Sequence, residues 1–211
     1  LEIPNEKATL NGMPNLIHLI KMIKSFGLPV VVAINRHPSD IKDEVDQLRD
    51  LLNSSNADGV AESTVFSDGG NGGIALAEEV VKVAEGTKKN VEYLYSIDAS
   101  IEDKVCSLAN KVYGASNVTW SNIAKKKMKM FTDLGWANLP ICMAKTHLSI
   151  SDKAERKGAP SGYDFHVSDL RASIGAGFIY PTAGNILTMP GLPSSPRELD
   201  IDGDGTLLGS L

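Results

Sequence analysis

The sequence is poor in cysteine, has no long apolar segment and carries no excess of positive charge. Its two cysteines, Cys106 and Cys142, both lie in apolar runs, so we expect reduced core thiols instead of disulfides or a metal site. The longest apolar run, residues 28–34, is far shorter than the roughly 20 residues that cross a bilayer. The net charge of −5 argues against binding of nucleic acid through its phosphates. We therefore expect neither a membrane nor a nucleic acid as partner.

The sequence also lacks a signal peptide, an initiator methionine and an obvious first strand. A cytoplasmic enzyme, or a piece of one, is the default expectation from these features. No Gly-x-x-x-x-Gly-Lys-Ser/Thr loop occurs, so a complete ATP site is not expected within these 211 residues. With 42% hydrophobic and 22% charged residues, the chain should fold as one large or two small globular domains.

The first 90 residues alternate between helical and strand patterns. Helices are expected at 14–26, 40–52 and 72–84, and strands at 28–34 and 59–66. The first strand is an unalternating, β-branched run, which is typical of a strand buried on both faces of a parallel sheet. Ser39 or Asp40 is expected to cap the second helix. We predict that residues 1–90 form part of a doubly wound, mostly parallel, Rossmann-like α/β sheet whose missing strands lie upstream.

Residues 91–211 are predicted to form a smaller α/β domain, and the polar residues 86–90 mark the boundary. Ser100 and Asp103 form a capping box at the start of a helix over 100–113, and a helix over 121–134 ends at Gly135. Strands are expected at 139–144, 163–167 and 178–180. The turn residues 202–205 predict a hairpin within 199–208.

Two strand ends of the first domain carry side chains that suit a nucleotide base. Asn35 follows the first strand, where parallel sheets bind ligands, and its amide can read a purine edge. Many P-loop nucleotide-binding proteins have Asn-Lys-x-Asp at this point, but Arg36 replaces the Lys, so the match is partial. Ser63 lies near the end of the second strand, at the position of a second base-reading loop. The alternative is ordinary loop polarity after a strand.

A second candidate site surrounds the strand at 139–144. Trp136 precedes this strand and Tyr163 lies in a Gly- and Pro-rich segment, so the two rings could sandwich a flat heterocycle. The residues alone favour the alternative, two half-buried hydrophobic anchors. Lys145, Thr146 and His147 follow the strand. Lys145 could bind a carboxylate or a phosphate, and His147 is expected to be a hydrogen-bonded loop residue.

Three other motifs favour structural roles. The Gly-rich turn at 69–73 could hold a phosphate at a helix start, but its spacing fits no phosphate motif, so a tight turn is favoured. The lysine-rich run at 125–129 is expected to be a solvated helix face, with anion binding as the alternative. Residues 200–205 imitate the start of an EF-hand, but Leu211 replaces the Glu at the twelfth position, so calcium binding is rejected. No metal ligands are assigned.

Many segments of this chain match, in order, a known enzyme family. They are residues 12–16, 26–35, 69–73, 101–104, 112–115, 138–147, 169–178 and 185–193. On these segments the chain closely resembles the C-terminal part of formate–tetrahydrofolate ligase, or 10-formyltetrahydrofolate synthetase. The family also occurs as the large domain of eukaryotic one-carbon (C1-tetrahydrofolate) synthases, for which a mitochondrial location is the alternative to a cytoplasmic one.

The resemblance implies a function in one-carbon metabolism. Family members make 10-formyltetrahydrofolate from formate, ATP and tetrahydrofolate, through formyl phosphate. They are homo-oligomers that use Mg-ATP and are activated by monovalent cations. The implied fold is a P-loop NTPase-like sheet that here lacks its N-terminal half, plus the smaller C-terminal domain. No cofactor is expected to be tightly bound to this portion.

The resemblance also implies roles for particular residues. The pterin would stack between Trp136 and Tyr163, and the nucleotide base would lie near Asn35 and Ser63. Lys145 and Thr146 are further candidates for substrate contact. The family's phosphate loop with its Lys, and its formyl-phosphate Arg, match nothing here, so no catalytic residue is assigned and this portion alone is expected to be inactive. The alternative is a non-catalytic folate-binding or oligomerisation module.

Overall fold

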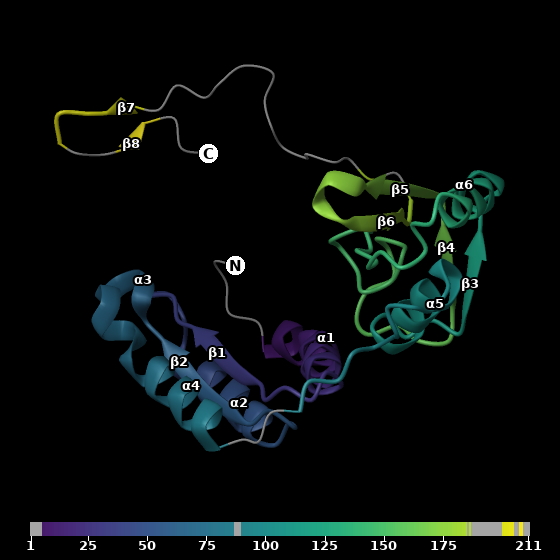
Figure 1. Ribbon diagram of the computed structural model, residues 1–211. Coiled ribbons are helices and arrows are strands. Elements are labelled where there is room, and N and C mark those ends of the chain that lie inside the picture. Colours follow the sequence, from purple (N-terminus) through teal and green to yellow (C-terminus); the bar gives the residue numbers. More distant parts are fainter. Residues whose placement is uncertain (1–5, 87–89, 185, 187–199, 205–206, 209–211) are drawn as a thin grey trace.

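The structure, a computed structural model, describes residues 6–86, 90–184, 186, 200–204 and 207–208. Within these residues it is a mixed α/β protein with four two-stranded sheets (Figure 1). Two of the sheets are parallel and two are antiparallel. Over the same residues, no helix is both long and apolar enough to cross a membrane.

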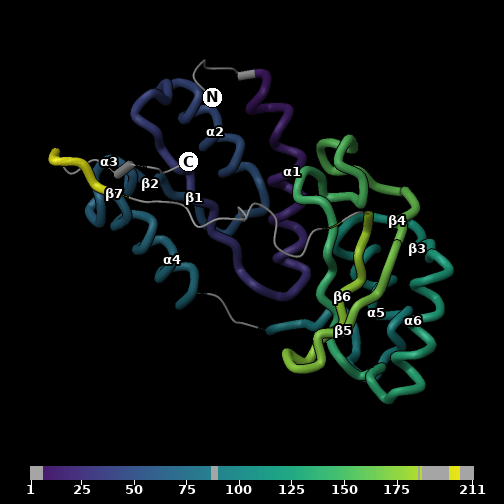
Figure 2. The backbone as a smooth tube through the Cα atoms, turned by 90° about the horizontal axis from the view of Figure 1, so that it is seen from above, coloured from purple at the N-terminus to yellow at the C-terminus, as the bar shows by residue number. Residues whose placement is uncertain are grey.

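The N-terminal part is built on one parallel strand pair. Strand β1 (Val31–Asn35) pairs with β2 (Gly59–Ser63), and helix α2 (Lys42–Asn53) connects them. Helices α1 (Glu6–Lys24) and α4 (Ile74–Gly86) lie beside this pair (Figure 2). Met13, Ile34, Val45 and Leu52 form its buried core. The predicted alternation of helices and parallel strands is therefore present, although two strands do not establish a doubly wound sheet.

Two boundaries and one burial prediction for this part were wrong. Helix α1 begins at Glu6, not at residue 14, and Pro14 lies inside it. An interior proline costs stability, which the burial of Met13 and Ile20 on either side of it offsets. Strand β1 begins at Val31, after Pro29, because proline cannot donate to the strand ladder. Ala33 is exposed, so β1 is not buried on both faces.

The starts of α2 and of the segment after β2 also differ from prediction. Ile41 occupies the N-cap position of α2, and the Asp40 carboxylate instead accepts a hydrogen bond from the His37 backbone N–H at 2.7 Å. The strand predicted to reach residue 66 ends at Ser63, and Val65–Asp68 form the short helix α3. The strand ends there because the Thr64 N–H donates to the Gly72 carbonyl oxygen at 3.1 Å.

The C-terminal part packs two helices against two small sheets. Its helices are α5 (Ile101–Lys111) and α6 (Asn122–Asp133); its strands are β3 (Asn117–Trp120), β4 (Asp164–Val167), β5 (Asp169–Ser173) and β6 (Phe178–Thr182). Parallel β3–β4 and antiparallel β5–β6 contribute fully buried side chains to one core, among them Phe165, Leu170 and Ile179. The Ser100 N-cap is confirmed, since the Asp103 N–H donates to Ser100 Oγ at 3.0 Å; the Asp103 carboxylate accepts from the Ser100 hydroxyl at 2.7 Å.

Other predictions for this part need correction. Strands β3 and β5 were not predicted. The segment 139–144 is not a regular strand, and isolated bridges join Ile141 and Ala144 to β6. Both cysteine thiols are free. Cys142 on this segment is exposed and Cys106 is half-buried, so neither lies fully in the core.

The C-terminal hairpin is confirmed, with β7 (Asp200–Ile201) antiparallel to β8 (Leu207–Leu208). The Asp204 N–H donates to Asp202 Oδ1 at 3.0 Å across its turn. Residues 185 and 187–193 of the family resemblance, the turn residue Gly205 and Leu211 lie outside the described residues, as do residues 87–89 of the predicted boundary.

The Gly-rich turn forms a 3-10 helix, η1 (Gly69–Gly73), which leads directly into α4. A Cβ added to Gly72 would lie 2.5 Å from the backbone carbonyl carbon of Thr64, closer than real Cβ atoms come. Gly69 has φ +58°, a conformation that favours glycine. The prediction of a tight turn is therefore confirmed, and the turn depends on the close approach of Gly72 to Thr64.

We expect Gly72→Ala to lower the free energy of unfolding by about 1–3 kcal/mol, because the backbone must move to admit the methyl group. Gly70→Ala is the matched control, since no heavy atom lies within 4 Å of its added Cβ and its φ is not positive. The control should change stability by less than about 0.5 kcal/mol. Urea unfolding followed by circular dichroism measures both, and equal midpoints for the two variants would contradict this account of the turn.

Candidate functional site

The carboxyl ends of β1 and β2 bring together the two residues predicted to bind a nucleotide base. Asn35 and Ser63 are the last residues of their strands and lie opposite each other in the ladder. The Arg36 N–H donates to the Ser63 carbonyl oxygen at 2.8 Å, which holds the two strand ends side by side. Asn35 is exposed, whereas Ser63 is only 7% exposed. The Asn35 amide is therefore the open polar group of this pair.

Ion pairs centred on Arg36 fix the two loops that leave this edge. Arg36 Nη1 lies 2.7 Å from Glu62 Oε2, and its Nε lies 3.8 Å from Asp40 Oδ2. Arg49 on α2 also pairs with Glu62. Because Asp40 also accepts from the His37 backbone N–H, this network sets the position of His37. Such partly buried pairs contribute more to geometry than to net stability.

The same edge presents a stacked aromatic pair that was not predicted. The rings of His37 and Phe66 have centroids 5.3 Å apart and planes 29° apart. Phe66 is 78% exposed, so one face of its ring remains available to a ligand. His37 Nδ1 lies 2.9 Å from Ser39 Oγ, which orients the imidazole. The positions of His37 and Phe66 could have indicated this pair from the sequence, since each residue follows a strand by a few residues.

Tyr163, one of the two residues predicted to sandwich a heterocycle, belongs to the C-terminal core. It is 9% exposed, and its hydroxyl donates to the Tyr113 carbonyl oxygen at 2.7 Å. The Arg156 guanidinium lies 4.8 Å from the centroid of its ring. The pKa of Tyr163 is raised to about 12, chiefly by burial and then by the nearby Asp152 charge, while the Arg156 charge opposes the rise. The ring thus already has a partner on one face.

Trp136 is half-buried and packs against Phe131, with ring centroids 5.6 Å apart. Its neighbour Ala137 accepts a hydrogen bond from Lys104 Nζ at 2.7 Å, near the start of α5. Tyr163 instead bonds to Tyr113, just beyond the end of that helix. About 10 Å of helix axis separates Lys104 from the helix end at 1.5 Å per residue. No described contact joins the two rings, and their stacking role stays a prediction.

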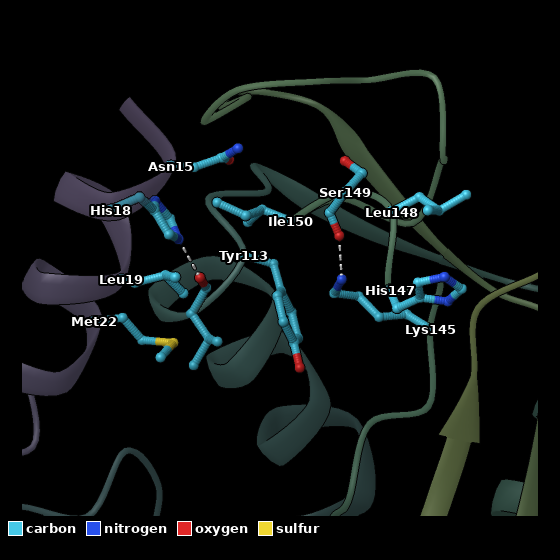
Figure 3. Close-up of a pocket in the computed structure, with 11 residues that line it drawn as sticks. Asn15, His18, Leu19, Met22, Tyr113, Lys145, His147, Leu148, Ser149 and Ile150 are labelled. Carbon is cyan, nitrogen blue, oxygen red and sulfur yellow. Dashed lines mark hydrogen bonds between the residues drawn. The ribbon is translucent and has the colours of Figure 1, made fainter. Parts of the chain in front are cut away.

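Lys145 and Thr146 lie in a loop that faces α1. Lys145 Nζ donates to the Thr146 carbonyl oxygen at 2.9 Å and to that of Ser149, and it lies 5.4 Å from the centroid of the Tyr113 ring. Burial lowers the pKa of Lys145, while the charge of Asp152 acts in the opposite direction. The Thr146 hydroxyl accepts from the Leu148 N–H at 3.2 Å. Thr146 therefore shapes the loop, and Lys145 faces a cavity beside α1 (Figure 3).

Comparison with known proteins gives one consistent family. The family model described as formate–tetrahydrofolate ligase matches residues 1–210. The chain is 45% identical to a formate–tetrahydrofolate ligase of Roseiflexus castenholzii and 47% identical to one of Desulforamulus reducens, covering 97% of this chain and 36% of each relative. It is 42% identical to the cytoplasmic C-1-tetrahydrofolate synthase of Pongo abelii, over 92% of this chain and 20% of that protein. The chain thus spans about a third of the length of these ligases.

The raised pKa of Tyr163 predicts how stability changes in alkali. An unfolded tyrosine ionises near pH 10, whereas the folded one holds its proton until about pH 12. The stabilisation from this proton is fully present below about pH 10 and is lost as the pH rises through about 12. Tyr163→Phe should remove the phenolate step near pH 12 from a spectrophotometric titration, while Tyr93→Phe, at a residue 86% exposed, should retain it. An unchanged titration in Tyr163→Phe would show that the ring is not buried as described.

Proposed function

Since this chain belongs to the formate–tetrahydrofolate ligase family, we propose that it forms the C-terminal portion of an ATP-dependent ligase that makes 10-formyltetrahydrofolate through formyl phosphate. Its part is to supply the folate pocket and some of the nucleotide-base pocket. Phosphoryl transfer requires a phosphate cradle, and the sequence contains no Walker-type loop. The chain alone is therefore proposed to be inactive as a ligase and to act together with the family's N-terminal region.

The observation that carries this proposal is the carboxyl edge of β1–β2. This edge places an exposed amide, Asn35, close in sequence and in space to the exposed stack of His37 and Phe66. Ligands of parallel α/β sheets bind at such an edge. A ligase that couples ATP to folate needs both substrates near each other, and a base-reading amide beside an open aromatic face suits that requirement. The β1–α2–β2 unit is compatible with the proposed P-loop-like, doubly wound domain over residues 1–90.

We place the pterin ring on Phe66 and His37. A flat heterocycle needs an open aromatic face, and Phe66 offers one, whereas Tyr163 is buried with a guanidinium over its ring. Stacking on an open ring contributes about 0.5–1.5 kcal/mol beyond the burial of area. The pair Trp136 and Tyr163, within the proposed folate-binding portion 91–211, is the alternative position.

Other substrates and partners follow from the family. ATP brings Mg²⁺ with its phosphates, and activation by a monovalent cation is proposed as well, with no residue of this chain assigned to either ion. A homo-oligomer and a cytoplasmic location are proposed, with a mitochondrial location for a eukaryotic paralogue. A second candidate function, a non-catalytic folate-binding or oligomerisation module, makes no use of Asn35.

Tetrahydrofolate binding to the 211-residue chain, measured anaerobically by calorimetry, tests the folate site. Phe66→Ala should weaken binding about tenfold, since it removes the open ring on which the pterin stacks. Tyr93→Ala is the matched control, because Tyr93 is also a highly exposed aromatic residue, and it should bind as the parent does.

Two outcomes would count against this placement. Loss of binding in Trp136→Ala with normal binding in Phe66→Ala would favour the alternative aromatic pair. No saturable binding to the parent chain at millimolar tetrahydrofolate would contradict the proposal that this portion holds the folate pocket.

A further inference from the structure

A cavity of about 350 Å³ lies between α1 and the loop at 145–150 (Figure 3). Its volume falls within the range of small-molecule sites in proteins, about 300–1,000 Å³. It shares no residue with the β1–β2 edge. The lining residues come from α1, from the end of α5 and from the loop: Asn15, His18, Leu19, Met22, Val112, Tyr113, Lys145, His147, Leu148, Ser149 and Ile150.

The cavity has one ammonium group in its wall, that of Lys145. His18 and His147 also line it, and no carboxylate of the described residues does. Lys145 is half-buried, and none of the ion pairs within the described part of the chain includes it. Two of its three ammonium protons are directed at carbonyl oxygens of its own loop, which are neutral acceptors. Burial lowers the pKa of Lys145, and the charge of Asp152 opposes this without forming an ion pair with Lys145 within the described residues, so the third ammonium proton remains available to an anion.

The wall of the cavity that α1 contributes contains two apolar side chains and is joined to the end of α5 by a hydrogen bond. Leu19 and Met22 extend from α1 toward the Tyr113 ring (Figure 3). His18 Nε2 donates to the Val112 carbonyl oxygen at 2.7 Å, because a carbonyl can only accept, and this bond ties α1 to the end of α5. The cavity therefore has apolar side chains of α1 on one side and, on the other, an ammonium group that forms no ion pair within the described part of the chain.

We propose that this cavity binds a small organic carboxylate with an apolar body, held by Lys145 at its charged end and by Leu19, Met22 and Tyr113 along its apolar part. The site is separate from the proposed folate pocket, and its ligand would link α1 to the C-terminal part of the chain. Hydrogen bonds to a charged group contribute about 1.5–3 kcal/mol, so the ammonium should discriminate a carboxylate from a neutral isostere by about tenfold or more.

The test uses benzoate as the probe and benzamide as its neutral isostere, titrated into the ¹⁵N-labelled 211-residue chain at constant ionic strength. Benzoate should give saturable shifts at amides of the loop 145–150 and of α1, at least about tenfold tighter than benzamide. Lys145→Gln should remove this preference. Lys126→Gln, which makes the same charge change at an exposed site on α6, should keep it.

A second variant protects the test against a folding defect in Lys145→Gln. Leu19 is 43% exposed, so Leu19→Trp can be accommodated on the helix surface while its larger ring fills the cavity, and it should abolish benzoate binding. Equal binding of benzoate and benzamide would overturn the proposal, as would equally tight binding of inorganic phosphate at the same amides. Absence of saturable shifts at these amides would also overturn it. Phe66→Ala should bind benzoate normally, which separates this result from that of the folate test.

Discussion

The parallel register of β1 and β2 is the constraint on which the candidate site depends. Five consecutive residue pairs, from Val31 with Gly59 to Asn35 with Ser63, set where each strand ends. A slip of one residue would turn every side chain of a strand to the other face and would expose Ile34, which is buried in the N-terminal core. The apolar core thus fixes the register, and the register fixes the distance between the two loops that carry the amide and the aromatic rings.

Charge and close packing then refine what the register sets. Arg36 follows Asn35 and Glu62 precedes Ser63, and the two side chains form an ion pair at 2.7 Å. This ion pair reinforces the ladder at the point where backbone pairing stops. On the β2 side, the approach of Gly72 to Thr64 turns the chain away from the sheet and into α3, which carries Phe66. Glycine at 72 permits this close approach, because an added Cβ would lie 2.5 Å from the Thr64 carbonyl carbon.

The parts of this structure that sequence could predict are those fixed by local interactions. The caps at Ser100 and Ser121 bond to backbone groups three residues away, so the sequence contains both partners. Asn35 and Ser63 could be placed at one edge because each ends a recognisable strand. Strand β3 could not be predicted, since its four residues gain their pairing from β4, 47 positions further on, with Asn117 opposite Asp164. Phe66 was assigned to a strand because the residues that end that strand lie beyond it in the chain.

Tyr163 and Phe66 differ in how much of the aromatic ring is left open to a ligand. Burying a large apolar side chain is worth about 1.5–3 kcal/mol, so an aromatic residue in a packed domain is normally found as Tyr163 is, with its ring covered and its hydroxyl bonded. Phe66 forgoes most of that stabilisation at a strand edge that the core holds rigid. A ligand that covers the Phe66 ring would bury this apolar surface, and the free energy of that burial would favour binding. Because such binding favours the folded state by mass action, the same ligand would stabilise the edge that receives it.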